Sequence, residues 1–554
     1  MAICREKRGN SVYLAEYKNV RVNGKVKHIY VKGLGVEGPD GKPIRKPKRV
    51  LDNVDISGTR RYGDVAVMWE LAEFLHFPDI IDRITPSNSD VSTGKILTMW
   101  AVNRAISPES ATGLQQWARR TALADLAEVS VDKLNKDRIY RALDEVCYSD
   151  DNNEDIYDHT LAIEKRLFRQ NGILDTDTLA YDLTSTYFYG TSCAMARKGY
   201  SRDKKYGRLQ IVIALAVSRK DHLPIVHKVY PGNTQDSTTT IEFLSTARGF
   251  GIKDATIIWD RILTTENTVR LAGDNGYHVI AGLPATRDDV KDALKKAGDI
   301  EELDHFMKKN GHGSLYAKSL DVEIFGEPHS VVVCLNTDMR ENSRGDRHEE
   351  LLEIKDKLTE LAEEKETWPE KKLHKAISKI VGGNKDLVQA RVKRKGVAPR
   401  IEVRIRKQTI RDQELREGRY AILHTDPKLT ARQVVGEYHG KDFIEKAFMS
   451  LKQDVAIRPI RHRTPSRIKS YVFVCVLGYY LRALLASRLK EKRPDASFDD
   501  FLEDLADVQR TTLTYGRSKS VRYLNLPTKT RDTLRAMKLS SRFRQVNTIE
   551  APSL

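Results

Sequence analysis

Four polar residues late in the chain have types and spacing that suit one face of a helix. Relative to a central glutamate they stand at −7, −4, 0 and +7, and they are Tyr438, Lys441, Glu445 and Lys452. On a continuous helix these offsets fall within a stripe about 60° wide. The neighbouring apolar stripe would pack on other elements, so we expect Glu445 at the edge of the buried face. A partly desolvated carboxylate at such a place could ligate a metal ion.

An ordinary amphipathic surface helix has the same pattern. Glu–Lys pairs three or four residues apart are common on solvated helices and need no further function. Gly440, inside the predicted helix of residues 429–454, would also weaken its continuity, because glycine costs about 1 kcal/mol in a helix interior. Spacing alone therefore leaves both interpretations open.

The composition indicates a multidomain protein with an anionic partner. The chain has 554 residues, and its 94 Lys and Arg against 77 Asp and Glu give a net charge of +17. That length exceeds one core, and the basic surplus favours nucleic acid. The five cysteines contain no C-x-x-C pair, which argues against a zinc ribbon or a disulfide framework. We expect no signal peptide, and we expect the apolar run 471–482 to form a buried helix, because it is too short to span a bilayer.

The N-terminal third divides into two segments that differ in their periodicity. Residues 1–56 form a β module whose alternating stretches flank Asn23-Gly24, a pair that favours a tight hairpin turn. This module is expected to bind DNA. Residues 57–170 have helical periodicity and are assigned to a helical domain for DNA binding or dimerisation.

The rest of the chain alternates strands and helices, with one long interruption. In residues 171–284 we expect strands at 179–188, 209–218, 224–230, 255–260 and 277–284, and helices at 237–249 and 264–274. Residues 285–417 are rich in lysine and glutamate, and we interpret them as an insertion of helical sequence followed by a strand at 401–406. Residues 418–495 resume the core with a strand at 419–425 and helices at 429–454 and 465–490. Residues 496–554 form a C-terminal segment with two short helices.

The run around Glu445 resembles a known signature. It is similar to the Tyr-x2-Arg-x3-Glu-x6-Lys pattern of DDE-type transposases of prokaryotic insertion sequences, with Lys441 where the family has arginine. The resemblance covers nearly the whole chain, because the runs 181–189, 199–239, 257–260 and 458–485 also resemble segments of that family. It implies an α/β fold with a ribonuclease H-like mixed sheet. Here that core would be interrupted by the insertion and preceded by the β module and the helical domain.

The resemblance implies three catalytic acids, which would also be the metal ligands. Two lie on strands and one on the late helix, and in this chain they are Asp182, Asp260 and Glu445. In-line cleavage of a phosphodiester uses two divalent ions about 4 Å apart, and Mg²⁺ prefers carboxylate ligands. We therefore expect two Mg²⁺ ions as cofactors, with Mn²⁺ as a substitute. Asp182 could instead be a satisfied polar residue, and Asp260 could be a cap for the following helix.

Basic residues are expected to form the DNA surface. The resemblance implies that Tyr438, Lys441 and Lys452 position the phosphate chain. On the strand 401–406, alternation would place Arg404 and Arg406 on one exposed face. A second cluster follows Glu445 and consists of Arg458, Arg461, Arg463, Arg467 and Lys469. Each cluster suits DNA phosphates but could also be an ordinary solvated surface.

The expected activity is DNA transposition. The protein would bind the terminal inverted repeats of its element as a homodimer, cut them by Mg²⁺-dependent hydrolysis and join the 3′-OH ends to target DNA. We expect double-stranded DNA as the partner, no membrane partner, and a cytoplasmic location at the nucleoid.

Two departures from the family pattern motivate an alternative, a catalytically silent DNA-binding derivative. Lys441 lacks the planar fork of arginine, and Ile262 replaces a glycine two residues after Asp260, where a positive φ would strain it. A nuclease of the same fold that cuts without strand transfer is a more distant alternative.

Overall fold

The computed structural model describes most of the chain, which folds into two compact units. The described residues are 2–8, 11–22, 25–44, 54–149, 156–172, 175–188, 193–202, 205, 207–300, 303–309, 312–364, 368–394, 399–515, 518–543 and 547–549. The smaller unit comprises Met1–Arg60, Gln509–Leu524 and Phe543–Leu554. The larger unit comprises Arg61–Val508 and Asn525–Arg542.

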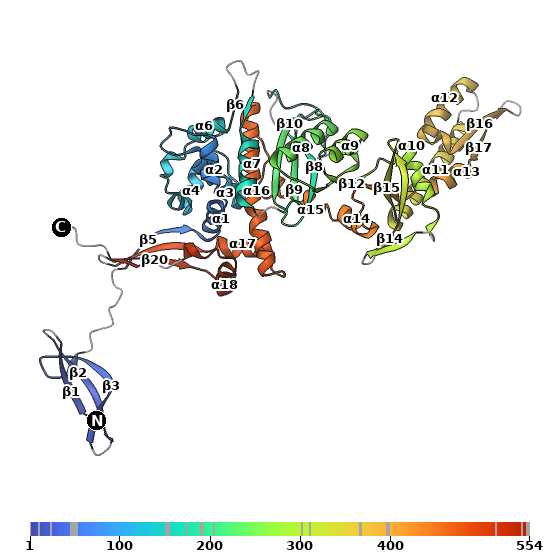
Figure 1. The fold of residues 1–554 in the computed structure, drawn as a ribbon. Coiled ribbons are helices and arrows are strands. Elements are labelled where there is room, and N and C mark those ends of the chain that lie inside the picture. Colours follow the sequence, from blue (N-terminus) through green and yellow to red (C-terminus); the bar gives the residue numbers. More distant parts are fainter. Residues whose placement is uncertain are drawn as a thin grey trace. The chain divides into compact units, whose positions relative to one another are not determined.

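The smaller unit contains two four-stranded sheets (Figure 1). One has the order β1-β2-β3-β4, formed by β1 (Ala2–Arg8), β2 (Ser11–Val22), β3 (Lys25–Glu37) and β4 (Pro43–Ile44). The other has the order β21-β20-β19-β5, formed by β21 (Asn547–Ile549), β20 (Ser518–Leu524), β19 (Gln509–Tyr515) and β5 (Val54–Arg61). The predicted N-terminal hairpin is confirmed as β2 and β3, and its Asn23-Gly24 turn lies outside the described residues.

Helices with buried faces form the N-terminal part of the larger unit, as predicted. They are α1 (Gly63–Phe74), α2 (Phe77–Ile84), α3 (Thr93–Ile106), α4 (Leu114–Arg120), α5 (Leu123–Ala127), α6 (Lys136–Val146) and α7 (Thr160–Asn171). Three of them, α1, α3 and α6, contact α16 (Pro465–Lys492), the long orange helix in Figure 1. Gly478 lets α3 approach closely, because a Cβ there would lie 3.1 Å from the Ala101 carbonyl oxygen.

The predicted buried helix around residues 471–482 is confirmed, but it is longer than the apolar run. α16 has 28 residues, and it is the one helix in the described part of the chain that is long and apolar enough to cross a membrane by length and composition. Most of it is buried against the other helices and the sheet. The two predicted C-terminal helices are also confirmed, as α17 (Phe498–Ala506) and α18 (Thr528–Ala536).

A mixed sheet of nine strands forms the centre of the larger unit. Its first five strands are β8 (Thr178–Tyr187), β9 (Gln210–Ser218), β10 (Pro224–Pro231), β11 (Thr256–Trp259) and β12 (His278–Gly282). They lie in the order β10-β9-β8-β11-β12, with β9 antiparallel to both neighbours and with β8, β11 and β12 parallel. This order with these directions is that of a ribonuclease H-like core, so the predicted fold class is confirmed.

Three strands occupy most of the described residues between 304 and 336, and the prediction of helical sequence there was wrong. β13 (Asp304–Lys309), β14 (His312–Ile324) and β15 (Glu327–Asn336) continue the sheet beyond β18 (Arg419–His424), which is antiparallel to both β12 and β15. The physical reason is burial, because Val331–Leu335, which begins with three β-branched valines, is almost fully buried against β18. Without β15, β18 would expose an unpaired edge.

The second half of the predicted insertion has a core of its own. It contains α11 (Thr337–Glu364), α12 (Glu370–Val381), β16 (Val388–Arg394), β17 (Pro399–Ile405) and α13 (Lys407–Glu414). Their apolar side chains meet in a cluster formed by Ile354, Leu358, Ile377, Val381, Leu387 and Val388. The lysines and glutamates that dominate the sequence are therefore the solvated faces of these helices.

Helices cover both faces of the central sheet. α8 (Asp236–Phe250), α9 (Glu266–Asp274) and α10 (Asp288–Lys296) pack on the face that includes Ile257. α14 (Ala431–His439) packs on the opposite face, through Val434 and Val435 against Ile258. Alternate residues of a strand point to opposite faces, so each residue of β11 faces the helices on only one side of the sheet. α15 (Asp442–Lys452) follows α14 and contacts β8 and β9.

Candidate active site

Asp182 and Asp260 are brought side by side by two parallel strands. In the pairing of β8 with β11, Thr178 lies beside Thr256 and Ala180 beside Ile258. Two residues further along both strands stand Asp182 and Asp260. Because the side-chain period of a strand is two, both carboxylates lie on the face of the sheet that Ile258 shares with α14. Asp182 is half-buried within β8, and Asp260 follows the last residue of β11.

Tyr438 near the end of α14 and Lys441 just after it reach the second of these carboxylates. The Lys441 Nζ atom lies 3.2 Å from Asp260 Oδ1, and the Tyr438 hydroxyl donates a long hydrogen bond of 3.5 Å to the same oxygen. The ammonium group also lies over the Tyr438 ring, 4.4 Å from its centroid. Asp260 Oδ1 further accepts the Arg261 backbone N–H at 2.8 Å. Asp260 thus caps the short 3-10 turn Arg261–Leu263, but the expectation that it caps the following helix was wrong, because Thr265 caps α9.

In this cluster two like charges are opposed by nearby cations, of which Lys441 acts on both carboxylates. Burial raises the pKa of Asp182 to about 6, the charge of Asp260 adds to this shift, and the charge of Lys441 opposes it. Burial also acts to raise the pKa of Asp260, but the charges and hydrogen bonds of Lys441 and Arg261 together outweigh it, and that pKa lies below its usual value. The two carboxylates are therefore close enough to repel each other, and Lys441 relieves part of the repulsion.

The helix predicted for residues 429–454 is divided at Gly440 and Lys441. α14 ends at His439 and α15 begins at Asp442, so the four-residue stripe does not lie on one continuous helix. A Cβ on Gly440 would lie 2.9 Å from the Gly436 carbonyl oxygen and 2.6 Å from an Arg219 guanidinium nitrogen. The break separates Tyr438 from Glu445 and lets Lys441 reach the sheet.

Glu445 is exposed, which corrects the expectation that it lies at the edge of the buried face. The physical reason is Phe443, which is buried and stacks on His222 with ring centroids 5.2 Å apart. Phe443 widens the buried face of α15 on the side away from Glu445. Among the described residues, no three His, Cys, Asp or Glu side chains lie close enough together to hold a metal ion. The assignment of Glu445 as a catalytic residue and third ligand stays a prediction.

The paired aspartates fit a divalent cation. Both offer carboxylate oxygens, which Mg²⁺ and Mn²⁺ accept as ligands, and their mutual repulsion is the kind of strain that a bound cation relieves. A cation there would use Asp182 and Asp260, with the remaining ligands supplied by other groups.

Comparison with known protein families decides the identity of this domain. The family model described as the transposase DDE domain matches residues 173–481. The chain belongs to this family. Transposases of this family generally use divalent metal ions. The match begins just before β8 and ends within α16, so it contains both aspartates, Lys441 and Glu445.

Two further comparisons concern individual proteins. A search of curated proteins found no match. Among solved structures, a cryo-EM structure of the piggyBac transposase synaptic complex with hairpin DNA is similar at 11% identity and a TM-score of 0.38. That similarity covers 89% of this chain and 87% of the other.

Two residues of the transposase domain that the sequence did not single out hold the α14–α15 junction. Gly282, at the end of β12, is buried under Tyr438, and a Cβ there would lie 2.3 Å from the Tyr438 hydroxyl oxygen. Arg219, after β9, forms an ion pair with Glu437 at 2.9 Å and lies over the Phe443 ring. Both contacts join residues far apart in the sequence, so no local pattern could have revealed them.

The family has glycine at the position of Ile262, but the isoleucine here has no strained backbone conformation. It lies in the 3-10 turn Arg261–Leu263, its φ is negative, and its side chain is 53% exposed. An isoleucine is therefore sterically acceptable in the transposase domain at this position. The departure at Lys441 is compatible with the site in another way, since its ammonium group contacts Asp260.

The predicted DNA-binding cluster after Glu445 splits into two kinds of residue. Arg467 forms a bidentate ion pair with Asp144 on α6, and Lys469 pairs with Asp158 at 3.0 Å. Arg458 lies over the Tyr187 ring. Arg461 and Arg463 are exposed, and Lys452 is half-buried. Arg467 and Lys469 are thus paired with acids in the N-terminal helical part of the larger unit. Their role in DNA binding stays a prediction.

Arg404 and Arg406 are both exposed, but they do not share a strand face. Arg404 lies on β17, opposite Gln389 of β16. β17 ends at Ile405, and Arg406 precedes the first residue of α13. The alternation argument was wrong for Arg406, because a helix begins where the strand was expected to continue.

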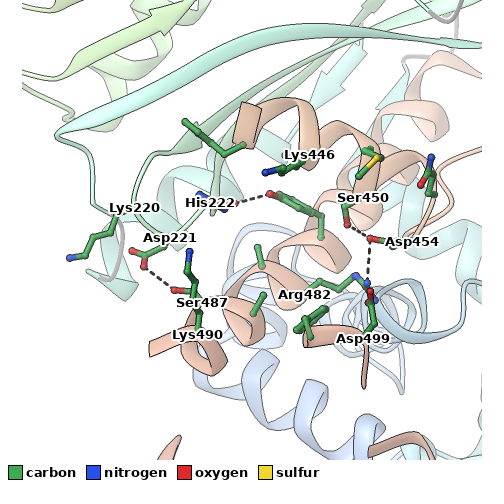
Figure 2. A pocket seen from close by; sticks show the side chains of 18 of the residues that line it. Lys220, Asp221, His222, Lys446, Ser450, Asp454, Arg482, Ser487, Lys490 and Asp499 are labelled. Carbon is green, nitrogen blue, oxygen red and sulfur yellow. Dashed lines mark hydrogen bonds and ion pairs between the residues drawn. The ribbon is translucent and has the colours of Figure 1, made fainter. Parts of the chain in front are cut away.

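A cavity of about 780 Å³ lies behind α15, away from the aspartates (Figure 2). Helices α15, α16 and α17 and the turn between β9 and β10 line it. Figure 2 shows that polar side chains at the rim of the cavity contact one another. Ser450 bonds to Asp454 at 2.6 Å, and Ser487 bonds to Asp221 at 2.9 Å. The rim has four cations and four acids, namely Lys220, Lys446, Arg482, Lys490, Asp221, Asp454, Glu491 and Asp499. Equal numbers of opposite charges give the cavity no net attraction for DNA.

Proposed function

We propose that the protein binds the terminal inverted repeats of a mobile element and catalyses Mg²⁺-dependent DNA cleavage followed by strand transfer. The observation that carries this proposal is the adjacent pair Asp182 and Asp260, with the Lys441 ammonium 3.2 Å from one of them. Carboxylates that hold cations beside a basic group form the kind of site that can receive a phosphodiester.

Each residue has a distinct role in this chemistry. Two divalent ions held by Asp182, Asp260 and Glu445 would polarise the phosphate and activate the attacking oxygen. Lys441 and Tyr438 orient the phosphate oxygens from the α14–α15 junction, and Lys452 extends the basic surface. In the first step, a water oxygen bonds to phosphorus and the bond from phosphorus to the 3′ oxygen breaks, leaving a 3′-OH. In the second step, that 3′-OH bonds to a target phosphorus, and a target 3′ oxygen leaves with the proton.

DNA binding is proposed for several exposed surfaces. The N-terminal β module and the helical part would recognise the end sequence, and the exposed Arg461, Arg463, Arg404 and Arg406 would neutralise phosphates. Arg458 and Arg467 belong to the same proposal, and Arg467 would first have to exchange Asp144 for DNA. We propose a homodimer in the DNA complex, which would act in the prokaryotic cytoplasm at the nucleoid.

The test first identifies the terminal inverted repeat in the DNA flanking the gene, and then uses purified full-length protein and a labelled duplex that carries it. With Mg²⁺, the parent should release a 3′-OH end and then form products joined to a target plasmid. Asp182→Asn should abolish both products while still shifting the duplex in a gel. Asp442→Asn, which alters an exposed acid of α15, is the matched control and should cleave normally.

A catalytically silent DNA-binding derivative is the second candidate. The exposure of Glu445 and the absence of a three-acid cluster among the described residues favour it. If the parent and Asp182→Asn both bind the duplex and neither cuts it, the silent derivative is correct. Cleavage without joined products would identify a nuclease instead.

A further inference from the structure

Lys441 occupies a position that a divalent cation would also favour. Its ammonium lies 3.2 Å from Asp260 Oδ1 and also lies over the Tyr438 ring, 4.4 Å from the ring centroid. Its side chain is 20% exposed, against 40% for Asp260, so the ion pair is partly withdrawn from water. An ammonium held by a carboxylate and an aromatic face is more than a transient surface contact.

The charge balance of the site shows what this ammonium does. Asp182 and Asp260 are neighbours on parallel strands, and the charge of Asp260 disfavours ionisation of Asp182. Lys441 is the lysine whose charge acts on both aspartates. A metal ion at the pair would bring positive charge to the oxygen that Lys441 already contacts. Two cations cannot share one carboxylate oxygen without repulsion, so the metal ion and Lys441 compete.

We propose that Lys441 is a built-in counter-ion that competes with the divalent metal for Asp260 and is released towards the DNA phosphate when the metal binds. The inference rests on the proposed function for the identity of the released partner, but the competition itself needs no DNA. The position of Lys441 favours such a movement, because it lies in the two-residue break between α14 and α15. A side chain there can leave Asp260 without disturbing a continuous helix.

The consequence is that the charge of Lys441 is paired with Asp260, and is not available to a phosphate, until a metal ion binds. Without metal, Lys441 neutralises Asp260 and so limits the repulsion that would otherwise build up in the half-buried pair. With metal, the same ammonium becomes available to a phosphate oxygen. Metal binding and phosphate binding would then strengthen each other, as linkage requires.

The test measures Mn²⁺ binding to full-length protein in the absence of DNA, from the electron paramagnetic resonance signal of free Mn²⁺. Lys441→Gln removes the competing charge and should bind Mn²⁺ about tenfold more tightly than the parent, the order expected for a partly buried ion pair. Lys441→Arg keeps the charge and should remain close to the parent. Asp260→Asn should weaken binding in either background.

The matched control is Lys446→Gln, which removes another lysine of the same helix region. Lys446 is exposed and pairs with Asp442 at 2.7 Å, so its loss should leave the Mn²⁺ affinity unchanged. Thermal melting of each variant verifies that it is folded, and Lys441→Met serves as a second neutral variant. Equal or weaker Mn²⁺ binding by folded Lys441→Gln and Lys441→Met would overturn the proposal.

The outcome is separable from the proposed function. If the parent cuts DNA but neutral variants at position 441 do not gain Mn²⁺ affinity, only the competition is refuted. If they gain Mn²⁺ affinity through Asp260 while the parent fails to cut DNA, the competition stands and the catalytic proposal falls.

Discussion

Gly282 offers a sharp test of whether the position of Tyr438 matters for catalysis. Gly282 is buried at the end of β12, and a Cβ added there would lie 2.3 Å from the Tyr438 hydroxyl oxygen and 3.1 Å from the ring carbon that bears it. An ordinary carbon–oxygen contact is about 1 Å longer than the first of these distances. In Gly282→Ala the phenol must therefore move by about that amount, because the strand backbone is fixed by pairing on both sides.

The displaced phenol changes catalysis more than folding. Tyr438 carries the ring over which Lys441 sits, so its movement also shifts the ammonium next to Asp260. A misplacement of about 1 Å can cost on the order of 100-fold in rate, whereas overpacking of this kind costs about 1–3 kcal/mol of stability. We expect Gly282→Ala to remain folded at 25 °C and to cut the labelled duplex 10- to 100-fold more slowly, a range that follows from these magnitudes.

The assay is single-turnover cleavage with saturating protein, combined with chemical denaturation. Gly436→Ala is the control, because Gly436 lies on α14 itself, is exposed, and has nothing within 4 Å of its added Cβ. That variant should cut at the parental rate and gain up to about 1 kcal/mol of helix stability. A Gly282→Ala protein that cuts as fast as the parent would refute the role assigned to Tyr438.

Four further variants test other parts of the structure. Burial lowers the pKa of His462 to about 4 from an ordinary 6.5, so the contribution of this residue to the free energy of unfolding should be constant above pH 6.5 and fall by about 3 kcal/mol towards pH 4; the difference in stability between the parent and His462→Phe in denaturation curves should change with pH by that amount, and a difference independent of pH would contradict it. Arg461→Ala should weaken DNA binding and lower the salt slope of the binding constant by about 1, as measured by fluorescence anisotropy, and an unchanged slope would contradict a phosphate contact. Arg467→Ala should instead lower the melting temperature, because it breaks a bidentate ion pair, and a variant as stable as the parent would contradict that structural role. Arg219→Met should slow cleavage and lower the free energy of unfolding by about 1 kcal/mol, because it removes the ion pair with Glu437 at the α14–α15 junction. Cleavage at the parental rate would show that this ion pair is not needed to position the junction.

The core strands could be predicted because burial on both faces leaves a continuous apolar run. β9 is buried at every residue, and its sequence shows this directly. β14 and β15 were not predicted because the surrounding sequence is rich in charged residues with helical spacing, and the whole segment was therefore interpreted as helical. The local pattern was present in Val331–Leu335, but the strand β18 that buries it comes more than 80 residues later in the chain.

The candidate site was predictable only in part for a similar reason. The resemblance supplied Asp182 and Asp260, and the pairing of β8 with β11 explains why these two positions meet. The exposure of Glu445 depends on Phe443 and its partner His222, which lies on another element. Gly282 has no sequence signal at all, since its importance comes from a tyrosine that only the fold brings against it.

The place of β18 between β12 and β15 also sets an order of events for a growing chain. Ile280 pairs with His424, so this part of the sheet closes only after the whole segment between them has been made. Long-range pairing of this kind forms slowly and late. Lys441, in the break between α14 and α15, and Glu445 on α15 both come after β18, so an incomplete chain contains the two aspartates but not the junction that faces them. We expect the nascent protein to lack nuclease activity until synthesis is nearly finished, and release of ribosome-bound chains truncated after residue 425 would test this by their failure to cut DNA.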